Sequence, residues 1–150
     1  IQGDEPLLNP DHIDYVVVEH QKHPEWDVVL PSLPIDKPET PHICKVTHDA
    51  NFRILYLSRA VIPQPFKHRP DFYLKHLSII SFTSESLRHY STLKPSNLER
   101  VEGIELLRAI ENGMVVGTVL LEGDSFSVDI KQDFDKAIER MAIDELRKQY

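Results

Sequence analysis

The stretch SNLERVEGIELLRAIENGMVVGTVLL, residues 96–121, indicates the fold class most directly, because a helical pattern in it passes into a strand pattern. Ser96 and Glu99 have the three-residue spacing of a helix capping box. Apolar residues then recur at helical spacing, at Leu98, Val101, Ile104, Leu107 and Ile110. Gly113 is a typical helix stop, and residues 114–121 resemble a strand. The stretch therefore predicts one helix up to Gly113, followed by a strand.

The rest of the chain alternates between helix and strand patterns in the same way. Asn9 followed by Pro10 is a typical helix start, and we expect that helix to end near His20. Strand-like runs occupy residues 27–30, 42–48, 52–58 and 76–82, with a hairpin turn at 49–51, a long loop at 61–73 and a short helix at 84–90. Asp129 is a candidate cap for a last helix, whose expected buried stripe is Phe134, Ala137, Ile138, Met141 and Leu146. The alternation predicts an α/β fold with a mixed sheet.

Composition limits the classes of protein to be considered. The chain has 150 residues, of which 41% are hydrophobic, which is enough for one globular core. The net charge of -7 argues against a nucleic-acid surface, because phosphate binding needs clustered Lys and Arg. No run approaches the roughly 20 apolar residues of a membrane span, and Cys44 is the only cysteine. We expect a cytoplasmic protein in which Cys44 has a structural role.

Two acidic loops are candidates for metal binding. Asp4 lies in the opening segment, residues 2–6, and Asp129 follows residues 114–121 after a short loop. Each follows a predicted strand, and carboxylate oxygens are the ligands that Mg²⁺ bound with phosphates requires. The ordinary alternatives are a turn for the opening segment and a helix cap for Asp129.

Six short segments resemble the motifs of one enzyme family. They are QGDEP at residues 2–6, LSRAVIP at 57–63, KHL at 75–77, PSNLE at 95–99, IELLR at 104–108 and VD at 128–129. In the same order they resemble the Q-G-D-E-P, S-R-A-x-I-P, R-H-L-G-I-Y, P-S-x-L-E, L-E-Q-L-R and V-D-T-P-E-D motifs of the 3-deoxy-manno-octulosonate cytidylyltransferases. The resemblance runs through nearly the whole chain.

The resemblance implies a fold that the residue patterns alone do not specify. It implies a three-layer, nucleotide-diphospho-sugar-transferase-like α/β fold, with a mixed sheet and helices on both faces. Residues 1–150 would be the C-terminal part of a single cytidylyltransferase domain, the part that binds the sugar acid and the metal. The family's N-terminal part, with its Gly-rich nucleotide loop, would be missing, and the opening at Ile1 rather than Met agrees with this expectation.

The same resemblance implies a reaction and a set of site residues. The reaction is transfer of CMP from CTP to 3-deoxy-D-manno-octulosonate with release of pyrophosphate, for lipopolysaccharide biosynthesis, by a homodimer that needs Mg²⁺. Asp4 and Asp129 would hold the Mg²⁺, and Arg59 would meet the sugar carboxylate with its planar guanidinium. The implied sugar contacts are Gln2, Arg59, His76, Glu99 and Glu102.

Several departures from the family motifs leave alternatives open. Ser78, Ile80 and Phe82 stand where the family's H-L-G-I-Y-G-Y segment carries Gly and Tyr, Leu106 replaces a Gln, and residues 130–131 replace a Thr-Pro pair. One alternative is an enzyme that activates sialic, pseudaminic or another ulosonic acid. Another is a noncatalytic binding or assembly module that kept the fold.

Overall fold

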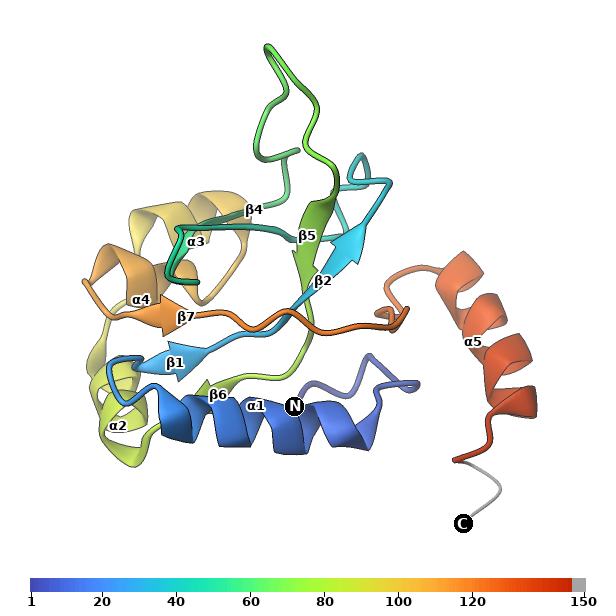
Figure 1. The fold of residues 1–150 in the computed structure, drawn as a ribbon, viewed down its shortest axis with the longest axis horizontal. Helices are drawn as coiled ribbons and strands as arrows, with labels where there is room; N and C mark the ends of the chain where they lie inside the picture. The colour runs from blue at the N-terminus through green and yellow to red at the C-terminus, as the bar shows by residue number, and fades with distance from the viewer. Residues whose placement is uncertain (147–150) are drawn as a thin grey trace.

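The structure is a computed structural model that describes residues 1–146, and within them it has five helices and two small sheets (Figure 1). The helices are α1 (Pro10–Lys22), α2 (Ser84–Thr92), α3 (Asn97–Glu102), α4 (Leu107–Glu111) and α5 (Lys131–Ile143). The strands are β1 (Val28–Val29), β2 (Ser32–Ile35), β3 (Lys45–His48), β4 (Ile54–Ser58), β5 (Tyr73–His76), β6 (Ser81–Phe82) and β7 (Val116–Gly117). The start of α1 is confirmed, because the Asn9 side chain accepts a hydrogen bond from the Asp11 N–H at 3.0 Å.

The strands pair in two sheets rather than in one. The first sheet has the order β6-β1-β7, in which β1 runs parallel to β7 and antiparallel to β6. The second sheet has the order β2-β5-β3-β4 and is antiparallel throughout. The predicted hairpin at residues 49–51 joins β3 to β4. The predicted α/β class with a mixed sheet is confirmed.

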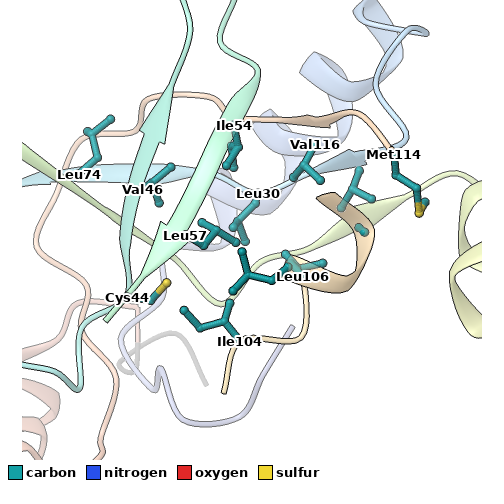
Figure 2. Close-up of a cluster of buried hydrophobic side chains, with 13 residues drawn as sticks. Leu30, Cys44, Val46, Ile54, Leu57, Leu74, Ile104, Leu106, Met114 and Val116 are labelled. Atoms are coloured by element: carbon teal, nitrogen blue, oxygen red, sulfur yellow. The ribbon is translucent and has the colours of Figure 1, made fainter. Parts of the chain in front are cut away.

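Helices cover both faces of the first sheet. Successive residues of a strand point to opposite faces, and the two residues of β1 belong to two different core clusters. Val28 packs in the cluster that contains Leu107 of α4, whereas Val29 packs in the cluster that contains Val16 of α1. Figure 2 shows the first cluster, where side chains of β3 and β4 meet those that flank α4. The expected three-layer arrangement is therefore present.

The single helix predicted from Leu98 to Gly113 is wrong. Gly103 has a φ of 63° and ends α3, and its N–H donates to the Glu99 carbonyl at 2.7 Å. Glycine adopts this left-handed conformation without the steric penalty that a Cβ imposes. The chain then restarts as α4, and Val101, expected in the buried stripe, is 75% exposed.

Two predicted strands are shorter than expected. Only residues 116–117 of the expected strand 114–121 form a strand, because the chain then crosses to the second sheet, where Leu120 bridges Ser32. The expected strand 76–82 is divided between β5 and β6. Residues 77–80 link the two sheets with Leu77 and Ile79 buried, and this link brings Ser78 to the cavity described below.

The buried stripe predicted for the last helix is confirmed only at Ala137. In α5 only Ala137 is buried, whereas Phe134 and Ile138 are 55% and 54% exposed. The helix lies at the end of the molecule opposite α2, α3 and α4 (Figure 1). Asp129 does not cap it either, because α5 begins at Lys131 and the Asp133 carboxylate accepts from the backbone N–H groups of residues 129 and 130.

None of the helices within residues 1–146 has both the length and the apolar character that are needed to cross a bilayer.

Replacing Gly117 with alanine is expected to destabilise the protein by about 1–3 kcal/mol, the usual cost of overpacking a core. The Trp26 ring packs directly on Gly117, and a Cβ at this position would lie 2.1 Å from a ring carbon. Denaturant unfolding monitored by circular dichroism measures the change. Gly3→Ala is the control, because its Cβ would meet no atom within 4 Å. An unchanged unfolding midpoint for Gly117→Ala would contradict this packing.

Candidate functional site

A polar cavity of about 180 Å³ lies where the opening loop meets the ends of β4 and β5, the turn after α3 and the segment before α5. Its lining residues are Gln2, Asp4, His42, Cys44, Arg59, His76, Ser78, Gly103, Ile104, Glu105, Ser127 and Asp129. We call it the central cavity. It brings together five of the seven residues that sequence reasoning proposed, from positions as distant as Gln2 and Asp129.

A second cavity of about 130 Å³ adjoins the central cavity. The two share the lining residues His42, Cys44, His76, Ser127 and Asp129. Lys75 and Asp133 are among the residues that line only the second cavity. Asp129 and His76 therefore stand on the boundary between the two spaces.

The backbone brings the two aspartates to the same cavity. The Val128 N–H donates to the Asp4 carbonyl at 2.8 Å, which places residue 129 beside the opening loop. The Gln2 N–H donates to the Ser78 carbonyl at 3.1 Å, which holds the other side of that loop. Asp4 Oδ1 is buried and has no hydrogen-bond partner among the described residues. A buried carboxylate oxygen without a donor is suited to a cation.

The residues present fit a metal ion that is shared with a substrate. No group of three or more His, Cys, Asp or Glu side chains able to hold a metal occurs within residues 1–146. Mg²⁺ in nucleotide enzymes is typically held by one or two carboxylates, with substrate phosphates and water as the other ligands. Asp4 and Asp129 on one cavity meet that requirement, and the unpartnered Asp4 Oδ1 agrees with it.

The guanidinium of Arg59 is largely occupied by backbone carbonyls. Nε donates to the Glu102 carbonyl at 2.9 Å, Nη1 to those of Pro41 and His42 at 3.0 and 3.5 Å, and Nη2 to that of Gly103 at 3.3 Å. These bonds use four of the five N–H donors of the group. The two parallel hydrogen bonds expected for the sugar carboxylate are therefore not available in this arrangement. Arg59 joins the loop before β3 to the turn after α3 and presents one further N–H.

Glu102 supports this arrangement from outside the central cavity. Its carboxylate accepts from the Ser58 hydroxyl at 2.7 Å, the Arg59 N–H at 2.9 Å and the Tyr56 hydroxyl at 3.3 Å. Burial acts to raise the pKa of Glu102, but these hydrogen bonds outweigh it and the pKa lies below its ordinary value. Glu102 lines neither cavity, so its position favours a role in holding the end of β4 over the expected sugar contact.

His76 lines both cavities and has one ring nitrogen engaged. Nδ1 lies 3.1 Å from the Leu77 carbonyl, which only accepts hydrogen bonds, so Nδ1 carries the proton. Burial lowers the pKa of His76, which favours the neutral ring. In the neutral ring Nε2 is then an acceptor. The expected contact to the sugar is thus better made to a hydroxyl group than to the carboxylate.

Glu99 lies outside both cavities and belongs to a structural ion pair. Its carboxylate accepts hydrogen bonds from Nε of Arg108, at 2.8 Å, and from Nη2 of the same residue. It also accepts a hydrogen bond from the Ser96 N–H at 2.9 Å. The Arg108 hydrogen bonds lower the pKa of Glu99 to about 2. This placement speaks against the expected sugar contact and agrees with the capping box at Ser96.

Glu99 should make the stability of the protein depend on acid pH. Its pKa of about 2 in the folded state lies below the ordinary value of 4.5. The contribution of the ionised Glu99 to the stability of the fold is therefore complete above the ordinary pKa. It is lost as the pH falls toward the pKa of the folded state. In denaturant unfolding between pH 6 and pH 3, we expect Glu99→Gln to lose less stability than the unchanged protein does. Equal losses for the two proteins would contradict this role.

Sequence reasoning missed one lining residue, Glu105, and one buried neighbour of the site, Lys45, which lines neither cavity. Glu105 lines the central cavity, and its place in the segment IELLR was the only local signal. Lys45 is fully buried, and its ammonium donates to the carbonyls of Thr40, Ile43 and Arg59. Burial lowers the pKa of Lys45. No sequence pattern identified Lys45, because its partners are backbone carbonyls, which every residue carries.

The thiol of Cys44 is expected to be unreactive at neutral pH. The residue is 5% exposed, and burial raises the pKa of its thiol to about 12. Since the thiolate is the reactive species, a thiol reagent near neutral pH should modify Cys44 only after unfolding. Absorbance after addition of Ellman's reagent measures this, with guanidinium-unfolded protein as the control. Rapid modification of the folded protein would contradict the structural role predicted for Cys44.

Comparisons with known proteins agree on one family. The family model described as "Cytidylyltransferase" matches residues 1–121. The "3-deoxy-manno-octulosonate cytidylyltransferase" of Rickettsia akari (strain Hartford) is 34% identical over 140 residues, which are 92% of this chain and 55% of the relative. The protein of the same name from Leptospira biflexa serovar Patoc is 36% identical over 141 residues, which are 92% of this chain and 57% of that relative.

A solved structure has the same fold. The structure of "CMP:2-keto-3-deoxy-manno-octonic acid synthetase complexed with CTP" matches with a TM-score of 0.87 at 28% identity, over 95% of this chain and 60% of that one. This chain spans about half the length of the curated relatives that it matches. Since the family model covers more than half of the residues, the chain belongs to the cytidylyltransferase family.

Proposed function

We propose that the protein transfers CMP from CTP to 3-deoxy-D-manno-octulosonate and releases pyrophosphate. The observation that carries the proposal is the meeting of Asp4 and Asp129 on one polar cavity, with Asp4 Oδ1 buried and unpartnered within residues 1–146. The names of the relatives support the same reaction, and so does the similar solved structure, which is a complex with CTP.

The sugar acid would bind in the central cavity. Its anomeric hydroxyl would attack the α-phosphate of CTP, and pyrophosphate would leave from the opposite side. Such a reaction depends mainly on positioning and on neutralising charge, with little covalent chemistry by the protein. No nucleophilic side chain is required, which agrees with the buried and weakly acidic Cys44 thiol.

Different residues of this chain would bind the metal ion, the sugar hydroxyls and the sugar carboxylate. Asp4 and Asp129 would hold Mg²⁺, which when bound neutralises the nucleotide phosphates and orients them. Gln2 and the Nε2 atom of His76 would bind sugar hydroxyls, and the remaining N–H of Arg59 would meet the carboxylate. The buried ammonium of Lys45 and the guanidinium of Arg59 would keep the cavity favourable to an anionic substrate.

The substituted family positions affect the cavity unequally. Of Ser78, Ile80 and Phe82, only Ser78 lines the central cavity. Ile80 and Phe82 pack against the first core cluster instead. The missing tyrosine hydroxyls therefore do not by themselves argue for sialic, pseudaminic or another ulosonic acid.

The proposal includes a homodimer working in cytoplasmic lipopolysaccharide biosynthesis. Exposed apolar side chains support association with a further protein surface, because Phe134 and Ile138, four positions apart on one face of α5, are 55% and 54% exposed. Sedimentation analysis of the whole protein tests this part. A monomer at all concentrations would contradict it.

The decisive experiment is turnover by the whole purified protein with CTP and Mg²⁺. A panel of sugar acids should include 3-deoxy-D-manno-octulosonate, sialic acid and pseudaminic acid. We expect pyrophosphate release and a CMP-sugar product with the first acid. Faster turnover with another acid would identify that acid as the substrate in place of 3-deoxy-D-manno-octulosonate. Absence of both turnover and CTP binding would favour a noncatalytic module.

A further inference from the structure

A buried carboxyl group next to Asp4 links the two loops that carry the aspartates. Glu5 is only 7% exposed, although it lies in a loop near the start of the chain. Its Oε1 accepts from the Ser78 N–H and its Oε2 accepts from the Ser125 hydroxyl, both at 2.8 Å. The bond to Ser125 joins residues that are 120 positions apart.

The segment that carries Asp129 depends on such links for its position. Residues 121–130 form no strand or helix, and the chain there approaches the opening loop at two points. At one point the Val128 N–H donates a hydrogen bond to the Asp4 carbonyl, and at the other the Ser125 hydroxyl donates a hydrogen bond to the Glu5 carboxylate. The bond between Glu5 and Ser125 therefore holds the middle of the segment, and the bond between Asp4 and Val128 holds it near its end.

A lysine reinforces the same link. The Nζ atom of Lys75 donates to the Ser125 carbonyl, so both the hydroxyl and the carbonyl of Ser125 are held. Burial lowers the pKa of Lys75, and the attraction of Glu5 opposes this shift. The link thus consists of a buried acid, a buried hydroxyl and a partly buried cation, none of which lines the central cavity.

We infer that Glu5 is a positioning residue that sets the separation of Asp4 and Asp129 for the metal, through its hydrogen bonds to Ser125 and Ser78. The inference rests on the proposed function, because it assigns Asp4 and Asp129 to a metal. Residues behind metal ligands typically change metal affinity by about 10- to 100-fold when they are replaced.

The test is the affinity of the whole protein for Mn²⁺ in the presence of CTP, measured by electron paramagnetic resonance. Glu5→Gln keeps the shape of the side chain but removes its charge, so Lys75 loses the attraction of Glu5 and the Ser125 hydroxyl must reverse to accept from the new amide. It should weaken Mn²⁺ binding by about 10- to 100-fold. Ser125→Ala removes one hydrogen bond and leaves the Glu5 carboxyl in place. Ser125→Ala should weaken Mn²⁺ binding by about threefold or more, the effect of losing one hydrogen bond.

The matched control is Asp27→Asn. Asp27 also accepts a hydrogen bond from a backbone N–H, that of Val115 at 2.7 Å, but it lies at the start of β1 and outside both cavities. We expect Asp27→Asn to lower the melting temperature, while its Mn²⁺ affinity stays within about twofold of that of the unchanged protein. A loss of stability alone would therefore not imitate the expected result.

The possible outcomes separate the two proposals. If the unchanged protein binds Mn²⁺ with CTP and both Glu5→Gln and Ser125→Ala bind it equally well, the positioning role is overturned and the proposed function stands. If the unchanged protein binds no Mn²⁺ with CTP, the metal site fails and the positioning role fails with it. Should Glu5→Gln not fold, judged by circular dichroism, Ser125→Ala decides the question alone.

Discussion

Replacing Asp4 or Asp129 with asparagine should reduce CMP transfer by on the order of 10²- to 10⁴-fold, since charge stabilisation by a catalytic metal contributes several kcal/mol. Asparagine keeps the size of the side chain but lacks the negative charge that holds a hard cation. Asp4→Asn should reduce the rate at least as much as Asp129→Asn does, because Asp4 Oδ1 is buried without a partner among the described residues. Initial rates of pyrophosphate release at saturating substrates measure the loss.

Magnesium dependence distinguishes a metal ligand from a residue needed for folding. Both variants should require a higher Mg²⁺ concentration for half-maximal rate while they keep the circular dichroism spectrum of the unchanged protein. Asp71→Asn is the control, because Asp71 is exposed and lines neither cavity. Rates within about tenfold of the unchanged protein in both variants would remove the metal role assigned to this pair.

Replacing Arg59 with lysine should raise the KM for the sugar acid by about 10- to 100-fold, whereas the KM for CTP should change by less than about threefold. The reason differs from the one suggested by the sequence. Lysine keeps the charge, but its single ammonium cannot donate at once to carbonyls of the loop before β3 and of the turn after α3. Both of these segments supply lining residues of the central cavity.

The control for this variant lies close to the same strand. Arg53→Lys makes the same chemical change just before β4, where the side chain is exposed and lines neither cavity. It should leave both KM values unchanged. Equal increases for CTP and the sugar acid in Arg59→Lys would assign Arg59 to general stability rather than to the sugar site.

The sequence was sufficient where the controlling interactions are local. The Asn9 cap, the hairpin at residues 49–51 and the capping box from Ser96 to Glu99 each depend on partners within a few positions, and all three are present. The short run at residues 27–30 likewise predicted a buried strand, of which residues 28–29 are present as β1. The order of six short motifs was also enough to indicate the family that the comparisons identify.

Local patterns failed where two possibilities have similar local signals. Helical spacing from Leu98 to Ile110 continues through Gly103, but only the folded chain shows that Gly103 takes a left-handed conformation and ends α3. The apolar stripe of α5 has correct spacing, yet Phe134 and Ile138 remain exposed within this chain. Periodicity states which residues share a face, whereas burial depends on what packs against that face.

The tertiary structure alone decided which of the candidate side chains share a site. Glu99 and Asp4 are both carboxylic acids in the sequence, with nothing to separate them. In the structure the Glu99 carboxylate is paired with Arg108, whereas Asp4 Oδ1 has no hydrogen-bond partner within residues 1–146. The roles of Glu5 and Lys45 could not be read from the sequence, because Glu5 binds groups 73 and 120 positions away and Lys45 binds backbone carbonyls, which every residue carries. The sequence by itself determined the fold class, the family and most of the candidate residues. Their convergence depended on long-range hydrogen bonds between loops, which follow from packing of the whole chain and not from any local pattern.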